Sequence, residues 1–437
     1  MSKDLCIGLA GLGTVGAGVV QLLASHGERL SLRTGRKLVL SAVSARDKKR
    51  ERGLNLGSAR WYDDAVVMAK APDIDVIVEL IGGDKGVAKN LVEAAIQSGK
   101  HVVTANKALI ARHGTALAAA AEKADVALNF EGAVAGGIPI IKSLRESFGG
   151  NGISSVHGIL NGTCNYILTQ MEETGAAFAD VLKEAQALGY AEADPAFDVE
   201  GTDTAHKLAI LTSLAFGVEP DIDHVYTEGI RRISALDIEF ARLFGYRIKL
   251  LGVARPVRSG IAQRVHPCMV PLSAAIADVS GVYNAVLTEG DFVGRSLLEG
   301  RGAGAGPTAS AVMSDILDIA QGLRAPAFGI PAHKLKKLKP APMDELKCAY
   351  YLRFSVADRP GVLAHIASAL AEEKVSIQSM VQRGQGGQSA PVYVVMITHE
   401  TKEAAINRAL KGMAGKGGVI EAPLLIRIEE FKPKADA

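Results

Sequence analysis

Five acids and a lysine lie close together in the segment from Gly189 to Lys207. Pro195 and Gly201 interrupt this segment, which predicts a structured loop that leads into a helix. Asp203 and Lys207 are four residues apart and would share one face of that helix. Such a cluster suits a small substrate with an ammonium group and a reactive oxygen, and the alternative is a solvated loop beside an ordinary surface ion pair. The acids are Glu192, Asp194, Asp198, Glu200 and Asp203.

A glycine-rich turn follows the apolar stretch that begins at Leu5. Gly11, Gly13 and Gly16 have G-x-G-x-x-G spacing, and residues 14–26 have helical periodicity. The first glycine permits a tight bend, the second lets the backbone approach a pyrophosphate, and the third lets the helix pack closely. The helix N-terminus attracts the anion. This arrangement predicts a dinucleotide site, and the alternative is a tight turn without a ligand.

The charged run after the next predicted strand, at 38–44, bears on the choice of cofactor. An acid at such a strand end is typical of an NAD site, whereas an arginine suits the 2′-phosphate of NADP. Arg46 opens a run that is basic through Arg50 and favours NADP(H). Asp47 could itself contact the ribose, so NAD(H) stays open, and a solvated loop is the third possibility.

Predicted strands and helices alternate through the rest of the first third. Strands are expected at 75–82, 101–106 and 126–130, and helices at 86–99 and 107–123. This pattern predicts a doubly wound parallel sheet, in which ligands lie at the carboxyl ends of the strands. Glu79, Thr104, Asn106 and Lys107 fall at such ends. A cation at a helix start is unfavourable, so Lys107 is predicted to reach a cofactor or substrate oxygen.

The pattern changes after residue 130. The glycine-rich stretch 131–139 predicts a shaped loop whose carbonyls, with the Glu131 carboxylate, could hold a hard cation or form a hinge. The glycine run at 300–306 predicts a second approach of the backbone to a ligand, or a return to the first domain. Strands are expected at 153–160, 247–254 and 262–270, and helices from Asn165, at 178–188, at 202–216 and from Thr308.

The last part of the chain begins with a linker. Prolines and a basic run mark residues 327–347 as a solvated connection. Beyond it, the predicted order is β-α-β-β-α-β, which is ferredoxin-like. Gly384, Gly386 and Gly387 predict a loose hairpin within it.

Composition narrows the function classes. The 437 residues predict two or three domains, and a hydrophobic fraction of 48% allows substantial cores. A net charge of +2 favours neither nucleic acid nor an anionic membrane as a partner. The four cysteines are far apart, which indicates a reducing compartment. With no signal peptide or membrane-spanning run in the sequence, we expect a soluble cytoplasmic protein.

The chain closely resembles bacterial homoserine dehydrogenases of the single-activity type with a C-terminal ACT domain. The resemblance covers essentially the whole chain and rests on the opening segment and on four motifs. These are Gly11-Leu-Gly-Thr-Val-Gly, Thr104-Ala-Asn-Lys, Gly136-Gly-Ile-Pro-Ile-Ile and Gly158-Ile-Leu-Asn-Gly-Thr-Cys-Asn-Tyr-Ile-Leu. Since no kinase-like region precedes the first domain, the fused aspartate kinase form is not expected.

The resemblance implies a Rossmann-type α/β cofactor domain, an α+β domain for substrate binding and dimerisation, and a ferredoxin-like ACT domain. We expect the first at 1–130, completed by about 308–330, the second at 131–307, the linker at 331–347 and the third at 348–437. The implied activity is the reversible reduction of L-aspartate 4-semialdehyde to L-homoserine by NAD(P)H, in threonine, methionine and isoleucine biosynthesis. Threonine is the implied effector, and a homodimer or homotetramer the implied assembly.

The resemblance also implies roles for individual residues. Lys207 corresponds to the proton-donating lysine, Lys107 to a second active-site lysine, Glu192 to a substrate contact, and Asp198 and Asp203 to supporting acids. The implied ligands of a sodium-type monovalent cation are Glu131, Val134, Gly136 and Ile138. The implied cofactor contacts are Gly11, Gly13, Thr14, Val15, Gly16, Arg46, Thr104, Lys107, Gly189 and Gly304.

Two other functions compete with this one. The first is an amino-acid sensor that keeps a dinucleotide fold without chemistry, against which the intact lysines and acids argue. The second is a related dehydrogenase that acts on another amino-acid aldehyde. A cofactor-oxidation assay with aspartate semialdehyde, followed by substrate profiling, separates the three.

Overall fold

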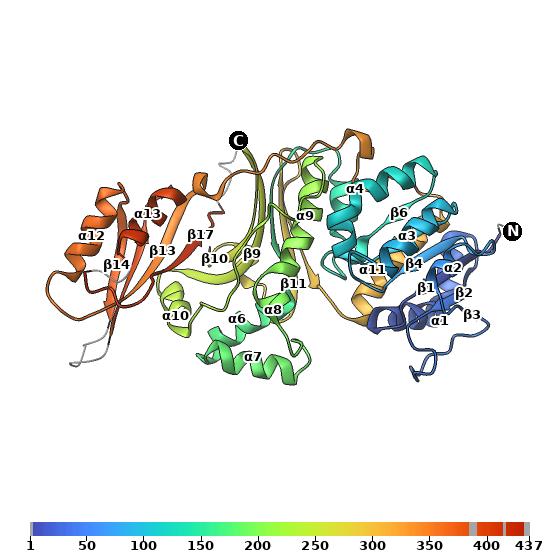
Figure 1. The fold of residues 1–437 in the computed structure, drawn as a ribbon, viewed down its shortest axis with the longest axis horizontal. Coiled ribbons are helices and arrows are strands. Elements are labelled where there is room, and N and C mark those ends of the chain that lie inside the picture. The colour runs from blue at the N-terminus through green and yellow to red at the C-terminus, as the bar shows by residue number, and fades with distance from the viewer. Residues whose placement is uncertain (1–2, 384–390, 414–416, 432–437) are drawn as a thin grey trace.

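Three parts follow one another along the long axis of the molecule (Figure 1). The computed structural model describes residues 3–383, 391–413 and 417–431. The predicted loose hairpin at Gly384, Gly386 and Gly387 therefore lies outside the described residues. Among the described helices, none is long and apolar enough to cross a membrane.

The N-terminal part contains a six-stranded parallel sheet, which confirms the predicted doubly wound fold. Its strands run in the order β3-β2-β1-β4-β5-β6. The strands are β1 (Leu5–Ala10), β2 (Leu38–Ser44), β3 (Arg60–Trp61), β4 (Val76–Glu79), β5 (His101–Thr104) and β6 (Leu128–Asn129). The helices that pack on it are α1 (Thr14–Thr34), α2 (Ala65–Ala69), α3 (Val87–Gln97), α4 (Lys107–Lys123) and α11 (Ala305–Ala320).

Successive residues of β4 explain why this sheet needs helices on both faces. Val76 and Val78 are buried in a cluster with α1 and α11, whereas Ile77 is buried in the cluster that includes α3. Because strand side chains alternate between faces, the three successive apolar side chains of Val76, Ile77 and Val78 need cover on both faces of the sheet. Helix α11 therefore returns from late in the chain, and a Cβ atom at Gly18 of α1 would lie 2.6 Å from the Ala305 carbonyl oxygen.

Several helix limits differ from those predicted. Helix α1 continues to Thr34 instead of ending at His26, because Gly27 lies within it and the left-handed Gly35 ends it. Helix α11 begins three residues before the predicted Thr308, and Pro307 lies in its first turn, where its missing N–H has no cost.

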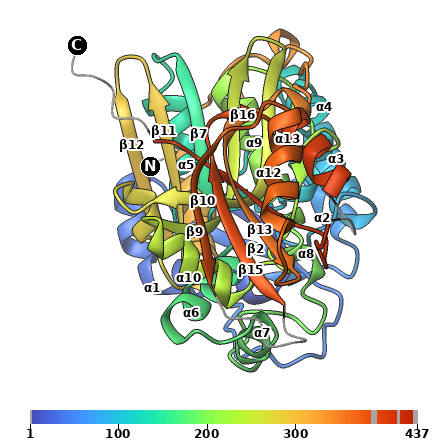
Figure 2. The same ribbon diagram turned by 90° about the vertical axis from the view of Figure 1, so that its left-hand side faces the viewer.

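The central part is built on strands of a second, eleven-stranded sheet. Figure 2 shows β12, β11 and β7 side by side at one side of it. The strands of this part are β7 (Ile153–Ile159), β8 (Tyr226–Thr227), β9 (Tyr246–Val257), β10 (Gly260–Pro271), β11 (Tyr283–Gly290) and β12 (Gly294–Arg301). Its helices are α5 (Ile140–Lys142), α6 (Gly162–Thr174), α7 (Phe178–Ala187), α8 (Ala196–Val199), α9 (Thr202–Phe216) and α10 (Ala235–Leu243). The β11–β12 hairpin and α10 were not predicted, and the helix expected from Asn165 begins at Gly162.

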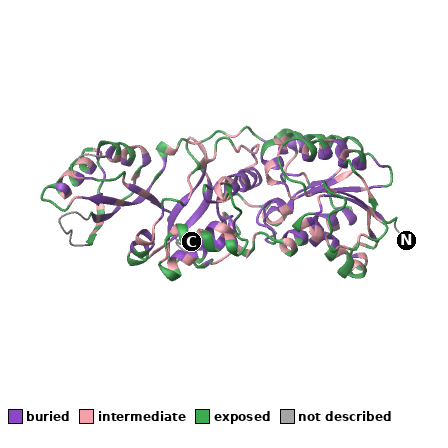
Figure 3. Cartoon of the chain, turned by 60° about the horizontal axis from the view of Figure 1, so that its bottom comes forward, coloured by how far each residue is buried: buried purple, intermediate pink, exposed green. Residues whose placement is uncertain are grey.

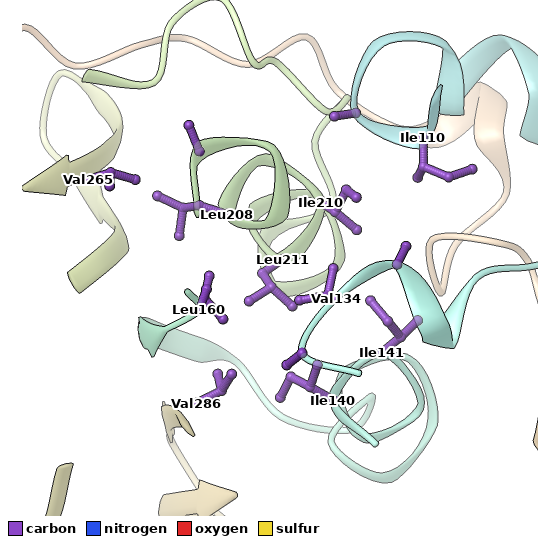
Figure 4. Close-up of a cluster of buried hydrophobic side chains, with 14 of the residues drawn as sticks. Ile110, Val134, Ile140, Ile141, Leu160, Leu208, Ile210, Leu211, Val265 and Val286 are labelled. Carbon is purple, nitrogen blue, oxygen red and sulfur yellow. The ribbon is translucent and has the colours of Figure 1, made fainter. Parts of the chain in front are cut away.

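Helix α9 lies in the core of the central part. Every residue from Asp203 to Leu214 is buried, so the helix is enclosed on all sides. Figure 4 shows its Leu208, Ile210 and Leu211 among apolar side chains from several elements, including Val265 of β10 and Ile110 of α4. This packing fixes the position of the polar side chains that α9 also carries.

The C-terminal part confirms the predicted β-α-β-β-α-β order. Its main elements are β13 (Lys347–Val356), α12 (Val362–Glu372), β14 (Ile377–Arg383), β15 (Val392–Thr398), α13 (Glu403–Met413) and β17 (Leu424–Ile428). A short strand β16 (Thr401–Lys402) pairs with β13. Figure 3 shows buried strands in this part as well as in the other two.

Strand β17 joins the last part to the central part, because it pairs with both β13 and β10. One sheet thus runs from the edge strand β12 to the edge strand β14. A buried ion pair reinforces the junction, with Arg264 Nη2 of β10 lying 2.6 Å from Glu429 Oε2, just beyond β17. The last part is therefore continuous with the sheet that supports α9.

Candidate active site

A cavity of about 430 Å³ lies between α4 of the N-terminal part and α9 of the central part. The carboxyl ends of the parallel strands face this region, as expected for a ligand site in such a sheet. The cavity brings both predicted lysines together with acids from the opening segment. Six of the predicted site residues line it: Lys107, Gly189, Asp198, Asp203, Lys207 and Gly304.

The Asp203 carboxylate bridges the two lysines. Its Oδ2 lies 2.7 Å from Lys207 Nζ, one turn further along α9. Its Oδ1 lies 2.8 Å from Lys107 Nζ, which belongs to α4. Lys207 Nζ also donates a hydrogen bond of 2.6 Å to the Leu160 carbonyl. An ammonium has three N–H groups, so one N–H of Lys207 remains for a ligand.

Burial and neighbouring charges together set the pKa values of Asp203 and Lys207. Burial alone would raise the pKa of Asp203, but Lys207 and Lys107 outweigh it and hold the pKa well below its ordinary value. Burial lowers the pKa of Lys207, and Asp203 opposes this effect only in part. Lys207 is thus a stronger acid than a solvated lysine.

Asn161 is a member of the site that was not predicted. Its side-chain nitrogen donates to Asp198 Oδ1 at 2.8 Å and to Asp203 Oδ2 at 2.9 Å. Its side-chain oxygen accepts from the Cys164 N–H and caps α6. The Asn-Gly-Thr sequence before a helix signalled the cap, but nothing local signalled the contact with acids some 40 residues later.

Asp198 lies at the wall of the cavity beside Asp203. Burial, with the like charge of Asp203, raises the pKa of Asp198 above its ordinary value. Neighbouring Phe197 places its ring centroid 5.6 Å from Lys107 Nζ. The two carboxyl groups thus have opposite pKa shifts, which is typical of sites that assign different roles to similar side chains.

The remaining acids of the opening segment lie away from this cluster. The exposed Glu192 does not line the cavity, and its carbonyl accepts from Gln186 Nε2 at 3.0 Å. Asp194 accepts from the backbone N–H of Ala196 and shapes the loop, and Glu200 pairs with Arg231 at the surface.

The glycine turn at the start of α1 fits a dinucleotide. Gly11 has a φ of 99°, and a Cβ atom there would lie 2.4 Å from the Leu80 carbonyl oxygen. A Cβ atom at Gly16 would lie 2.0 Å from the Gly11 carbonyl oxygen. At Gly13, just before the helix, no atom lies within 4 Å of the Cβ position. The turn therefore packs tightly against backbone at Gly11 and Gly16. At Gly13 it leaves room for a phosphate at the N-terminus of α1, where Thr14 and Val15 lie.

Arg46 and Asp47 follow β2 at the same end of the sheet, and both are exposed. The Asp47 carboxylate accepts from the Lys49 N–H at 2.9 Å, and its carbonyl accepts from Arg52 Nη2. Asp47 thus helps to fold its own loop.

Thr104 is held by hydrogen bonds within the protein. Its hydroxyl donates to Glu79 Oε2 at 2.6 Å and accepts from the Asn106 N–H at 3.0 Å. Glu79 also accepts from the N–H groups of Ile81 and Gly82, and Asn106 caps α4. This network holds the start of α4, and with it Lys107, in place.

The loop after β6 contains the predicted cation ligands. Glu131 accepts from the N–H groups of Ile141 and Lys142 at 3.0 and 2.8 Å. The backbone of Gly136 is left-handed, with a φ of 49°, and the loop between Val134 and Ile138 is buried apart from Gly137. A short 3₁₀ helix at Glu131–Ala133 begins this stretch, for which only a loop was predicted. Carboxylate and carbonyl oxygens are the donors that a hard cation takes, and this stretch contains both types of group.

Comparisons with known proteins agree with this geometry. The sequence model described as "Homoserine dehydrogenase, NAD binding domain" matches residues 11–131. The model described as "Homoserine dehydrogenase" matches residues 139–317, and the ACT domain model matches residues 350–413. The cofactor is therefore a nicotinamide dinucleotide, and the C-terminal part contains an ACT domain.

Relatives and solved structures extend the match to the whole chain. A homoserine dehydrogenase from Neisseria gonorrhoeae is 47% identical, over 98% of this chain and 99% of its own. One from Pseudomonas aeruginosa is 45% identical, over 98% of this chain and 100% of its own. The crystal structure of a homoserine dehydrogenase from Thiobacillus denitrificans has a TM-score of 0.92 at 44% identity, over 98% of this chain and 99% of its own. The chain thus belongs to the homoserine dehydrogenase family and is an oxidoreductase that acts on a CH–OH group.

Proposed function

We propose that Lys207 donates the proton when L-aspartate 4-semialdehyde is reduced to L-homoserine. The observation that carries this proposal is the buried Lys207 ammonium, which is held by Asp203 and the Leu160 carbonyl and lines the cavity with one N–H left over. When bound, the nicotinamide dinucleotide supplies the hydride for the aldehyde carbon. The aldehyde oxygen then becomes negative, and a positioned cationic acid stabilises that charge and transfers its proton.

Lys107 and the two acids complete the proposed site. Lys107 contributes a second positive charge from the cofactor-binding part, next to the developing oxyanion. Asp203 positions both lysines through its two oxygens. Asp198, held by Asn161 at the cavity wall, suits the substrate ammonium. Glu192 can contact the substrate only if the exposed loop that carries it closes over the cavity on binding.

Replacing Lys207 with alanine tests this assignment. We expect kcat for homoserine oxidation to fall by about 10²–10⁴-fold, the usual contribution of a general acid or base, with cofactor binding retained. Lys183→Ala, which removes an exposed lysine of the nearby α7, is the matched control and should keep full activity. Near-normal turnover by Lys207→Ala would refute the role of Lys207.

We also propose that the enzyme prefers NADP(H) to NAD(H). Arg46 is exposed next to the sheet edge where the adenosine ribose lies in such folds, and Asp47 is engaged in its own loop. A hyperthermophilic archaeal homoserine dehydrogenase of known structure, 27% identical over 72% of this chain and 97% of its own with a TM-score of 0.62, was solved in complex with NADPH. Initial rates with NADPH and NADH measure the preference directly.

A monovalent cation of the sodium type is proposed at the loop after β6. Glu131, with the carbonyls of Val134, Gly136 and Ile138, would hold it, and the ion would stiffen the segment between the two parts that form the active site. Replacing sodium with a bulky organic cation should lower thermal stability, and an unchanged melting temperature would contradict the proposal.

We propose the following domain limits for this chain. They are 1–130 with about 308–330 for the cofactor domain, 131–307 for the substrate and dimerisation domain, 331–347 for the linker and 348–437 for the ACT domain. The packing of α11 on α1 supports the first assignment. We propose threonine as feedback inhibitor and a homodimer or homotetramer as the assembly, to be tested by initial rates with threonine and by light scattering.

A further inference from the structure

An aromatic side chain, that of Phe197, lies next to Lys107. Phe197 belongs to the short helix α8 and directly precedes Asp198, which lines the active-site cavity. It is 46% exposed, and within the described part of the chain it belongs to none of the buried apolar clusters. The packing of a hydrophobic core therefore does not account for an aromatic residue at this position.

The ammonium of Lys107 lies over the Phe197 ring. Lys107 Nζ is 5.6 Å from the ring centroid, within the roughly 6 Å over which a cation is attracted to the face of an aromatic ring. The same nitrogen lies 2.8 Å from Asp203 Oδ1. The Lys107 ammonium thus has two partners of different kinds, a carboxylate and the electron-rich face of a ring.

Phe197 is itself packed against helix α9. Its ring centroid lies 5.7 Å from that of His206, with an angle of 39° between the ring planes. His206 is buried, and its Nδ1 lies 2.9 Å from the Thr202 carbonyl oxygen, one turn earlier on α9. Because the core encloses α9, His206 gives the Phe197 ring a fixed surface to pack on. The position of the ring is therefore set by the same helix that carries Asp203.

Lys107 needs such an additional contact more than Lys207 does. The Lys107 side chain is 33% exposed, whereas that of Lys207 is 10% exposed. Lys207 also donates to the Leu160 carbonyl. A lysine side chain is a flexible stem, and a partly exposed ion pair restrains such a stem weakly. A ring beside the Lys107 ammonium removes part of this freedom and keeps water from one side of the charge.

We propose that Phe197 is a positioning residue, which keeps the Lys107 ammonium beside Asp203 and close to the developing oxyanion. This inference rests on the proposed role of Lys107 in the reaction. Loss of the ring should lower kcat and leave KM for homoserine nearly unchanged, because the oxyanion charge that Lys107 stabilises develops only in the transition state. Tyrosine has a ring of the same shape, so it should replace phenylalanine at this position.

A double-mutant cycle on the full-length enzyme tests the proposal. Phe197→Leu keeps an apolar side chain but removes the ring, so kcat for homoserine oxidation should fall about three- to tenfold, the effect expected for a lost cation–π contact. Lys107→Met should itself lower kcat. In the Lys107→Met background, Phe197→Leu should cause little further loss, since no ammonium remains to be positioned. Phe197→Tyr should keep most of the wild-type kcat.

A matched control and the opposite outcomes complete the test. Phe292→Leu, at a position that is 91% exposed in the turn of the β11–β12 hairpin, should keep the wild-type kcat. Equal losses from Phe197→Leu with and without Lys107, or a loss in Phe197→Tyr as large as in Phe197→Leu, would overturn the proposal. Wild-type kcat in Phe197→Leu beside a low kcat in Lys107→Met would overturn it too and leave the proposed function intact. Wild-type kcat in Lys107→Met would refute the role of Lys107, and this inference with it, without affecting Lys207 as the proton donor.

Discussion

The ammonium of Lys107 lies 2.8 Å from the Asp203 carboxylate, although one residue begins a helix of the parallel-sheet part and the other lies in the core of the central part. Asp203 is almost fully buried, while a third of the Lys107 side chain is exposed. The contact therefore spans the two halves of the cavity. The geometry of the ion pair therefore depends on how those two halves are placed relative to each other.

Replacing Asp203 with asparagine should reduce both activity and stability. Removal of one partner from a buried ion pair typically costs about 3–5 kcal/mol, because the charge that remains is uncompensated. Without the carboxylate, the pKa of Lys207 should fall further, because burial then acts unopposed. Urea unfolding and kcat measure the two effects. Asp194→Asn, at an exposed loop position, is the control, and a stable, fully active Asp203→Asn enzyme would contradict the proposed bridge.

The two directions of the reaction should depend on pH in opposite ways. Aldehyde reduction needs protonated Lys207, so its rate should fall as pH rises through the Lys207 pKa. Burial places that pKa below the ordinary lysine value. Homoserine oxidation needs the neutral amine and should rise over the same range. Profiles of kcat against pH in both directions, measured with the same protein, test this, and parallel profiles would argue against Lys207 as the acid.

The fall of kcat/KM for homoserine at low pH should reflect the ionisation of Asp198. Burial, with Asp203 beside it, raises its pKa, so on lowering the pH it loses its charge earlier than an exposed aspartate would. A neutral Asp198 no longer attracts the substrate ammonium, and kcat/KM for homoserine should therefore fall at low pH mainly through KM. Asp198→Asn should have a raised KM and lack this limb. If Asp198→Asn keeps the same low-pH limb, the limb belongs to another ionising group.

Helix α9 should tolerate little loss of packing. Leu211 is 0% exposed and lies among the side chains of Figure 4, so Leu211→Ala should cost about 2–5 kcal/mol of unfolding free energy. Leu243→Ala, at a position that is 52% exposed on α10, is the matched control and should change stability by less than about 0.5 kcal/mol. Urea titrations compare the two, and equal losses would contradict the central position of α9.

Arg46 should decide between the two cofactors. A charge-assisted hydrogen bond contributes about 1.5–3 kcal/mol, so Arg46→Ala should raise KM for NADPH by about tenfold to hundredfold and barely change KM for NADH. Arg50→Ala, in the same exposed run, serves as the control. Equal effects on both cofactors would show that Arg46 does not contact the 2′-phosphate.

The parts of the fold that follow from local patterns were predicted. Strand Val76–Glu79 begins with three successive apolar residues, and the spacing of Gly11, Gly13 and Gly16 predicts the turn between β1 and α1. The contact of Asn161 with Asp203 was not predicted, because it joins elements that only the tertiary fold brings together. The β11–β12 hairpin was not predicted for a similar reason, since the half-exposed strand β12 is specified mainly by its pairing with β11.

The pairing of β17 with β10 has a consequence for biosynthesis. Residues 260–271 emerge from the ribosome well before residues 424–428, yet these two strands are neighbours in the finished sheet. Until β17 is made, part of the β10 edge stays open, and Arg264 lacks its partner Glu429. An open strand edge is a template for wrong pairing with other chains. The nascent enzyme therefore passes through an interval in which the sheet that supports α9 is incomplete, until β17 pairs with β10.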